Sequence, residues 1–351
     1  MIETVTGEEA ARIFLPHIGL RGGGGASGRA DGRAGVAGAA AVAAAGAGTA
    51  GARGLPYLRE LALRFAEFPY ENISKIIKVS RAASPEEALR LPTEVVTDHL
   101  DRNFGGTCFS LTFLFERMLK AAGFDCYKVM ADMRSGRNVH CLVVVREGGA
   151  KYIVDPGYAL YEVIELGTRA RVRCPHAVID LEPASGCVSG GPGGVGGPAG
   201  PGGEATFDLW TEDASGRKWR YRFADTPASD AEFEAHWLAS FGKSTLNNIC
   251  LTRMTPRGHI YLRKDFFKFT SPTAVEKRRL AQGRERLIEE EFGIRGEWVE
   301  VAQRLLDERR AAGAGSAASA ASTSPGARAT RAARATRATR ATPATEAGAR
   351  G

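Results

Sequence analysis

The stretch VHCLVVVREGGAKYIVD, residues 139–155, contains two apolar runs separated by a glycine pair. The first run is rich in β-branched residues and is typical of a buried strand, and the second reads as the strand that returns. If the glycines at 148–149 form a two-residue hairpin loop, Leu142 faces Asp155. Because side chains alternate across a strand, His140 and Asp155 then project from one face as diagonal neighbours. A loop one residue longer would put them on opposite faces, so this interpretation depends on the turn.

A second glycine pair, Gly105-Gly106, ends an extended stretch just before an apolar run with helical spacing, residues 109–122. Cys108 is expected in the first turn of this helix, with Thr107 as its N-cap. The unpaired N–H groups and the positive dipole end of a helix stabilise a thiolate, the nucleophilic form of cysteine. The pattern therefore favours a nucleophile on a buried, rigid element.

Each of these residues has an ordinary structural interpretation when it is considered alone. An apolar-flanked cysteine is usually a core residue, a histidine in a strand is usually packed, and an aspartate before Pro156-Gly157 commonly forms a turn. Their conjunction instead predicts a catalytic triad for acyl transfer, with Cys108 as nucleophile, His140 as base and Asp155 as the carboxylate that orients it.

Four motifs resemble those of the arylamine N-acetyltransferases, of which the chain would be a divergent member. In chain order they are Phe68-Pro69-Tyr70-Glu71-Asn72-Ile73, Gly105-Gly106-Thr107-Cys108-Phe109, Val139-His140, and Tyr152-Ile153-Val154-Asp155-Pro156-Gly157-Tyr158. The resemblance covers most of residues 1–308, interrupted by insertions. Three positions depart from the family pattern: Phe104 stands where an arginine is usual, Ser110 where a glutamate is usual, and Thr112 where an asparagine is usual.

This resemblance implies an α+β fold with an N-terminal helical bundle, a central antiparallel β-barrel and a C-terminal α/β lid, and with the triad where bundle and barrel meet. The expected boundaries are 1–124 for the helical domain with a disordered Gly/Ala insertion at 21–54, 125–263 for the barrel with a Gly/Pro-rich insertion at 186–205, 264–310 for the helical lid region, and 311–351 for a disordered Arg/Ala/Thr tail. Within the lid region, residues 274–292 are expected to be helical.

The resemblance also implies the reaction. An acetyl or other acyl group would pass from a CoA thioester to Cys108 and then to an arylamine, hydrazine or other amine, in a ping-pong mechanism. Acetyl-CoA would be the cosubstrate without any metal, and Phe109, Val139 and Tyr70 would bind substrate. Two alternatives use the same residues differently: a transglutaminase-like thiol hydrolase or amide synthase, and a binding protein without activity.

Net charge and cysteine content indicate which binding partners and which cellular compartment to expect. Six arginines against Glu346 in residues 311–351 supply most of the net charge of +7, so the folded body does not suggest nucleic-acid binding. The six cysteines show no CxxC pair or zinc spacing, which together with the acidic start of the chain favours a reducing cytoplasm. No signal region or membrane-length apolar stretch is evident, so no membrane partner is expected.

Overall fold

The computed structural model describes residues 5–17, 54–66, 68–184, 205–243, 246–271 and 273–322. The chain divides after Leu306 into two compact units, and the sheets and the cavity described below belong to the first of them. None of the helices in these ranges is both long and apolar enough to span a bilayer. Most of the two expected insertions, 21–54 and 186–205, lies outside the described residues.

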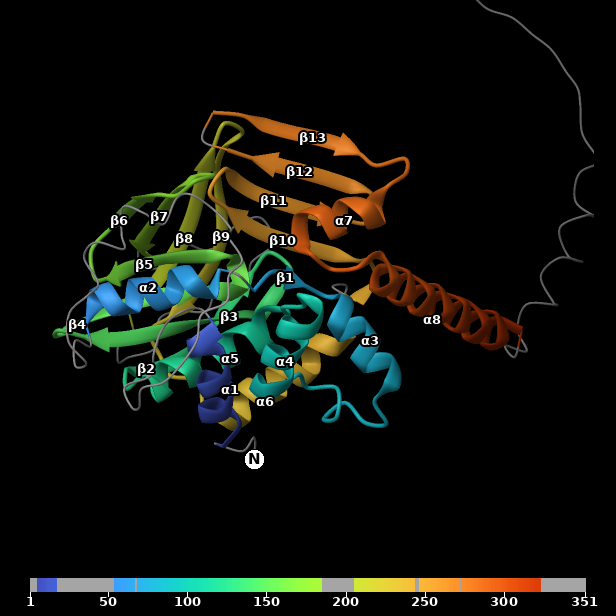
Figure 1. Cartoon of the computed structure of the whole chain (residues 1–351), viewed down its shortest axis with the longest axis horizontal. Coiled ribbons are helices and arrows are strands. Elements are labelled where there is room, and N and C mark those ends of the chain that lie inside the picture. The colour runs from blue at the N-terminus through green and yellow to red at the C-terminus, as the bar shows by residue number, and fades with distance from the viewer. Residues whose placement is uncertain are drawn as a thin grey trace, which may run out of the picture. The chain divides into compact units, whose positions relative to one another are not determined.

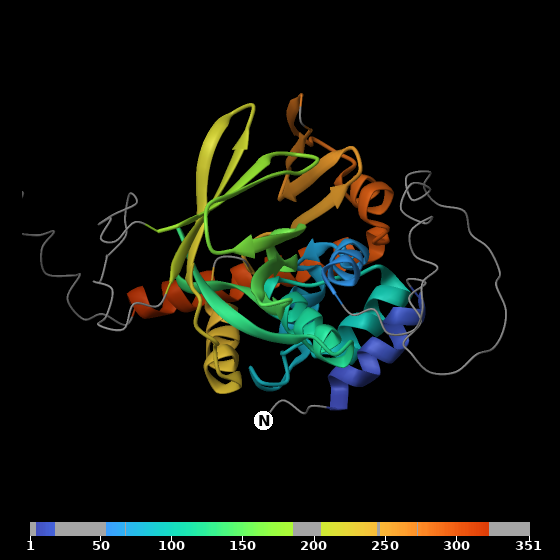
Figure 2. The same ribbon diagram turned by 90° about the vertical axis from the view of Figure 1, so that its left-hand side faces the viewer.

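Helices dominate the first part of the fold. They are α1 (Val5–His17), α2 (Leu55–Phe65), α3 (Ile73–Arg81), α4 (Pro92–Arg102) and α5 (Cys108–Ala121), with the short strand β1 (Tyr70–Glu71) between α2 and α3. Apolar faces of α1, α2, α4 and α5 meet in one core cluster, which includes Phe14, Phe65 and Phe115. Figures 1 and 2 both show α1, α4 and α5 gathered on one side of the sheets.

An antiparallel sheet of eight strands follows, in the spatial order β5-β4-β3-β2-β9-β8-β7-β6. The strands are β2 (Asp125–Met133), β3 (Gly136–Glu147), β4 (Ala150–Asp155), β5 (Leu160–Leu166), β6 (Ala170–Arg173), β7 (Val178–Pro183), β8 (Thr206–Asp213) and β9 (Gly216–Ala224). The edge strands β5 and β6 follow one another directly in the chain, so the sheet curls into a nearly closed barrel (Figure 2). Its interior is an apolar cluster that contains Leu142, Val144 and Leu209.

The hairpin of β3 and β4 has the register expected from the sequence. Glu147 pairs with Ala150, and the pairs continue without interruption to Val143 and Val154. Gly148 and Gly149 have φ of 59° and 81°, the left-handed values that a two-residue type I′ turn requires. Strand β3 is buried on both faces, because Leu142 and Val144 point into the barrel while Val143 and Val145 pack on the helices. His140 therefore shares the barrel-side face with Leu142.

A second antiparallel sheet of five strands, in the order β1-β10-β11-β12-β13, forms the C-terminal part. Its strands are β10 (Cys250–Thr255), β11 (Gly258–Arg263), β12 (Phe266–Thr270) and β13 (Val275–Arg279), and it packs with α3, α7 (Arg284–Phe292) and the start of α8 (Gly296–Ser322). Helix α6 (Asp230–Ala239) and the 3₁₀ turn η3 (Ser240–Gly242) connect the two sheets. This arrangement confirms the expected α+β class with bundle, barrel and lid (Figure 1).

Three expected boundaries differ from the structure. The barrel-like sheet ends with β9, and the strands within 250–263 belong to the second sheet, so the barrel does not extend to residue 263. The helix expected over 274–292 is wrong in its first part, since Val275–Arg279 pairs with β12 as an edge strand. A charged segment of this kind adopts a strand when a neighbouring strand offers its hydrogen bonds, and local propensity does not reveal that partner. Helix α8 continues to Ser322, beyond the expected start of the tail, while residues 323–351 lie outside the described part.

Candidate active site

The glycine pair before Cys108 lies where no side chain fits. A Cβ on Gly105 would come within 1.8 Å of the Pro69 carbonyl oxygen, and a Cβ on Gly106 within 2.3 Å of Ser110 Oγ. The backbone N–H of Glu71 donates to the Gly106 carbonyl at 2.9 Å, which ties the segment to β1. The pair therefore packs the extended chain closely against the Phe-Pro-Tyr-Glu segment and fixes where helix α5 begins.

Cys108 is the first residue of α5, as the sequence predicted. Thr107 is the N-cap by position, but its side chain makes no capping hydrogen bond. The Cys108 thiol is partly buried and lies 3.9 Å from the Val139 carbonyl oxygen at the start of β3. Thr112, one turn further along α5, donates to the Cys141 carbonyl at 3.1 Å and so joins this helix to β3.

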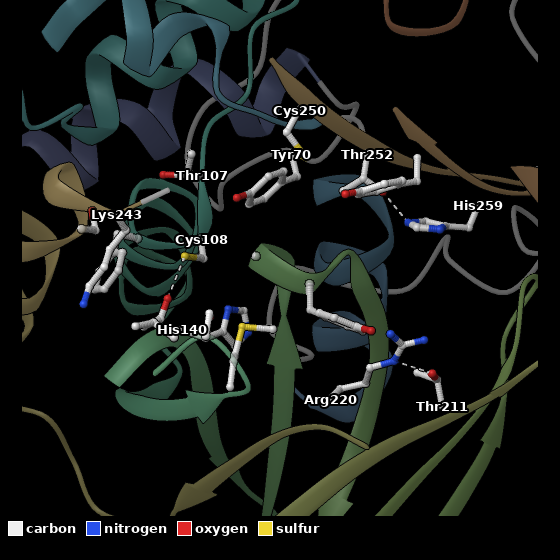
Figure 3. Close-up of a pocket in the computed structure, with 18 of the residues that line it drawn as sticks. Tyr70, Thr107, Cys108, His140, Thr211, Arg220, Lys243, Cys250, Thr252 and His259 are labelled. Carbon is white, nitrogen blue, oxygen red and sulfur yellow. Dashed lines mark hydrogen bonds between the residues drawn. The ribbon is translucent and has the colours of Figure 1, made fainter. Parts of the chain in front are cut away.

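His140 and Asp155 meet as the hairpin register requires. The His140 Nε2 and Asp155 Oδ2 atoms are 2.7 Å apart, and both side chains are at most 3% exposed. Asp155 Oδ1 also accepts the backbone N–H of Tyr158 at 2.9 Å, so both carboxylate oxygens are engaged. Because Nε2 faces the carboxylate, Nδ1 is the ring nitrogen left for the thiol. Figure 3 shows His140 and Cys108 side by side on the wall of a cavity.

The surroundings of Cys108 stabilise its thiolate. A hydrogen bond from the Cys141 thiol is the largest influence and lowers the pKa of Cys108; burial opposes it, and the hydrogen bond and charge of His140 lower the pKa further. The result lies well below the ordinary pKa of a thiol. Burial alone would lower the pKa of His140, but Asp155 and Cys108 outweigh it and raise this pKa to about 10. The two shifts together favour a thiolate–imidazolium pair.

Lys75 is a second cation near Cys108, and it was not predicted from the sequence. Its ammonium donates to Ser240 Oγ at 2.7 Å and lies 4.6 Å from the centre of the Phe241 ring. Burial lowers the pKa of Lys75 to about 8, while the nearby thiols of Cys108 and Cys141 oppose this change. The signal that could have identified it was a lysine between the isoleucines of α3, Ile73, Ile76 and Ile77, all of which are buried.

One cavity of about 580 Å³ contains most of these groups. Cys108 and His140 line it, and so do the three residues expected to bind substrate, Tyr70, Phe109 and Val139. Asp155 does not line the cavity and lies behind His140. Phe109 is also part of an aromatic cluster, with its ring stacked 6.3 Å from that of Trp237 on α6. Among the described residues, no three His, Cys, Asp or Glu side chains are arranged to hold a metal ion.

Comparison with known proteins identifies the fold. Residues 54–184 match the sequence profile of the family described as N-acetyltransferase. The fold matches the arylamine N-acetyltransferase from Mycobacterium abscessus with a TM-score of 0.65 at 17% identity, covering 87% of this chain and 97% of that one. The chain has the arylamine N-acetyltransferase fold. The resemblance recognised in the four sequence motifs is thereby confirmed.

Two further solved structures extend the comparison. The arylamine N-acetyltransferase of Nocardia farcinica gives a TM-score of 0.60 at 17% identity, over 83% of this chain and 92% of that one. A Bacillus cereus arylamine N-acetyltransferase, described as having a Cys-His-Glu catalytic triad, gives 0.55 at 14% identity, over 82% of this chain and 99% of that one. No curated protein sequence matched the chain.

The guanidinium of Arg90 contacts the backbone of the glycine pair Gly105-Gly106. Phe104, just before this pair, stands where the N-acetyltransferase motif usually has an arginine. Arg90 is 3% exposed; its Nη1 donates to the Gly105 carbonyl at 2.5 Å and to Ser74 Oγ at 2.6 Å, and its Nη2 donates to Asp98 at 2.8 Å. Glu71, which is fully buried, lies 3.7 Å from the same guanidinium. Phe104 instead packs in the core of the lid, with its ring edge-on to Trp298.

Replacing Arg90 by methionine is expected to destabilise the fold by about 3–5 kcal/mol, because Glu71 would keep a buried charge without its cation. Denaturant unfolding measures this loss. Arg64→Met is the matched control: Arg64 pairs with Glu60 on the surface of α2 and is 41% exposed, so a change within about 0.5 kcal/mol is expected. Equal stability of the two variants would show that Arg90 does not support the loop.

Gly157 packs against Cys108. A Cβ at this position would lie 2.6 Å from Cys108 Cβ and 3.3 Å from His140 Cε1. Gly157→Ala is therefore expected to displace the two side chains and to reduce the acyl transfer proposed below on the order of a hundredfold, while circular dichroism shows a folded protein. Gly242→Ala is the control, since nothing lies within 4 Å of a Cβ there. Unchanged turnover in Gly157→Ala would mean that the close approach has no bearing on the chemistry.

Proposed function

We propose that the protein is an acyltransferase that moves an acetyl or other acyl group from a CoA thioester, through a thioester on Cys108, to an arylamine, hydrazine or other amine. The observation that carries this proposal is the contact of His140 with the buried Asp155 at 2.7 Å beside the Cys108 thiol, on one wall of a substrate-sized cavity. The arylamine N-acetyltransferase fold supports the same reaction class.

In the first half-reaction the Cys108 thiolate attacks the carbonyl carbon of the acyl thioester. The bond from Cys108 Sγ to the acyl carbon forms, the bond from that carbon to the CoA sulfur breaks, and the imidazolium of His140 gives its proton to the departing thiolate. The Cys108, Phe109 and Ser110 N–H groups belong to the first turn of α5 and precede its first main-chain bond, from Leu111 to Thr107. Donors of this kind suit the negative oxygen that develops during the attack.

In the second half-reaction the amine attacks the acyl carbon held on Cys108. The new carbon–nitrogen bond forms, the carbon–sulfur bond breaks, and the neutral ring of His140 takes the proton of the amine. Asp155 holds the ring in position and stabilises its positive form in both steps. The Cys-His-Glu triad described for the Bacillus cereus protein likewise combines a thiol, an imidazole and a carboxylate. Lys75 would stabilise the resting thiolate, which disappears once the thiol is acylated.

Product analysis tests the proposed reaction against the hydrolase alternative. The protein is incubated with acetyl-CoA, with and without an arylamine, and free CoA, acetate and N-acetylated amine are measured. Transfer predicts CoA release that depends on the amine and is matched by N-acetylated product. Release of CoA and acetate at the same rate with or without the amine would indicate a thiol hydrolase and would contradict the proposal.

A further inference from the structure

The cavity extends from Cys108 to a group of polar side chains that the reaction described above does not use. Arg220 on β9 and Thr211 on β8 come from the eight-stranded sheet, whereas His259 on β11 and Lys268 on β12 come from the five-stranded sheet. All four line the same cavity as Cys108. In Figure 3, Arg220, Thr211 and His259 lie on the opposite side of the view from Cys108 and His140.

Positive charge exceeds negative charge in this group. Arg220 Nε donates to Thr211 Oγ1 at 2.6 Å, and within the described ranges no carboxylate lies at ion-pair distance from its guanidinium. Lys268 lies 3.4 Å from Asp213, but the same carboxylate also contacts Lys218 at 3.3 Å and accepts the backbone N–H of Ser215. One carboxylate thus serves two lysines, and the charge of Arg220 is left without a counterion.

Neutral hydrogen-bonding groups complete the walls. The rings of His176 and His259 are 5.1 Å apart, and burial together with the charges of Arg220 and Lys268 lowers the pKa of His176 to about 4 and that of His259 to about 3. Both imidazoles are therefore neutral at pH 7. Two buried atoms of cavity-lining residues, His176 Nδ1 and the hydroxyl of Thr270, have no hydrogen-bond partner in the described part of the chain. Buried polar atoms without partners are uncommon, and a ligand is one of the ways in which they become satisfied.

We infer that Arg220, Lys268 and the two histidines form an anion-binding subsite, which holds a carboxylate or phosphate of one of the two substrates while the reacting group lies at Cys108. A guanidinium and an ammonium that approach from different sheets suit the oxygens of an oxyanion, and neutral donors add hydrogen bonds without adding charge. This inference rests on the proposed acyl transfer and adds a requirement to it, namely an acidic group remote from the reacting atom.

The oxyanion has two possible sources, the phosphates of the CoA donor and a carboxylate on the amine acceptor. Four substrate pairs separate them: acetyl-CoA or the phosphate-free S-acetyl-N-acetylcysteamine as donor, each with aniline or 4-aminobenzoate as acceptor. The variants are Arg220→Gln and Lys268→Gln. Arg217→Gln is the control on the same strand, because Arg217 pairs with Asp180 and Glu182 and does not line the cavity.

Loss of one charged hydrogen-bonding partner is expected to raise KM about ten- to a hundredfold for the substrate that carries the oxyanion. A donor phosphate predicts this rise for acetyl-CoA alone, and an acceptor carboxylate predicts it for 4-aminobenzoate alone, with kcat little changed. An equal effect on all four pairs, or no effect in both Arg220→Gln and Lys268→Gln, would overturn the subsite. Arg217→Gln should match the parent in every pair.

A binding measurement separates this inference from the proposed reaction. Calorimetric titration of the unreacted protein with inorganic pyrophosphate and with benzoate should show binding of at least one of them, weakened in Arg220→Gln and unchanged in Arg217→Gln. Binding without any acyl transfer would retain the subsite and reject the proposed function. Acyl transfer without anion binding, and with the same effect of the variants on all four substrate pairs, would retain the proposed function and reject the subsite.

Discussion

Cys108→Ala is expected to abolish covalent acylation and to lower acyl transfer by about four orders of magnitude or more, since in the proposed reaction the Cys108 sulfur is the atom that becomes acylated. The fold should be retained, because the change removes a single partly buried sulfur atom, whose contact with the Val139 carbonyl is long at 3.9 Å. Intact mass after exposure to acetyl-CoA measures the first effect, and thermal unfolding measures the second.

Cys250→Ala is the matched control for this experiment. Cys250 lines the same cavity, but burial raises the pKa of its thiol to about 11, so it is protonated and unreactive at neutral pH. This variant should be acylated like the parent. If acylation persists in Cys108→Ala and is lost in Cys250→Ala, the nucleophile is Cys250 and its assignment to Cys108 is wrong.

His140→Gln is expected to reduce acyl transfer by about three to four orders of magnitude, because the thiol loses both its base and the cation that stabilises its thiolate. Alkylation of Cys108 as a function of pH isolates the second effect. In the parent the pKa of Cys108 is well below the ordinary value and that of His140 is about 10, so the alkylation rate should already be at its plateau at pH 7 and should fall only as the medium becomes acidic.

The charge of His140 decides how the alkylation of Cys108 depends on pH. The raised pKa of His140 means that its stabilising charge is fully present below about pH 6.5 and is lost as the pH rises through about 10. Without this charge the pKa of Cys108 should rise towards that of an ordinary thiol, near 8.5, and alkylation at pH 7 should slow by up to roughly thirtyfold. The hydrogen bond from Cys141 and the charge of Lys75 remain in this variant and keep the loss below that limit. Asp155→Asn should have a smaller effect, because the amide oxygen can still accept the Tyr158 N–H and only the negative charge is lost.

His236→Gln is the control for the pH series, because His236 lines the same cavity from α6 and bonds to Asn138, away from the thiol. Its alkylation profile should follow that of the parent. If His140→Gln is alkylated at pH 7 as rapidly as the parent, the thiolate does not depend on His140.

The local part of the site was predictable from the sequence. The β3–β4 register follows from the glycine pair at the turn. The two glycines have left-handed φ values of 59° and 81°, which a two-residue loop needs. Once the register is fixed, the alternation of side chains brings His140 to the same face as Asp155. The position of Cys108 at the start of α5 likewise follows from a glycine pair followed by an apolar run.

Contacts between distant segments were not predictable in this way. Arg90 reaches Gly105 from the segment before α4, and Lys75 reaches Ser240 from α3, so neither partner is implied by local spacing. The same limit explains β13: its charged sequence suggests a helix, but pairing with β12 stabilises a strand. The cluster of polar side chains around Arg220 forms because two sheets meet across a cavity, and no sequence motif predicts that meeting.

The most direct test of a thioester intermediate on Cys108 is an intact-mass pulse and chase. The parent protein is exposed to acetyl-CoA without an acceptor, freed of excess donor, mapped by peptide mass, and then mixed with an arylamine. We expect one acetyl group on the peptide that contains Cys108, and we expect it to disappear as N-acetylated amine forms. An acetyl group on Cys108 that the amine does not remove, or amine acetylation without any enzyme-bound acetyl group, would contradict this intermediate.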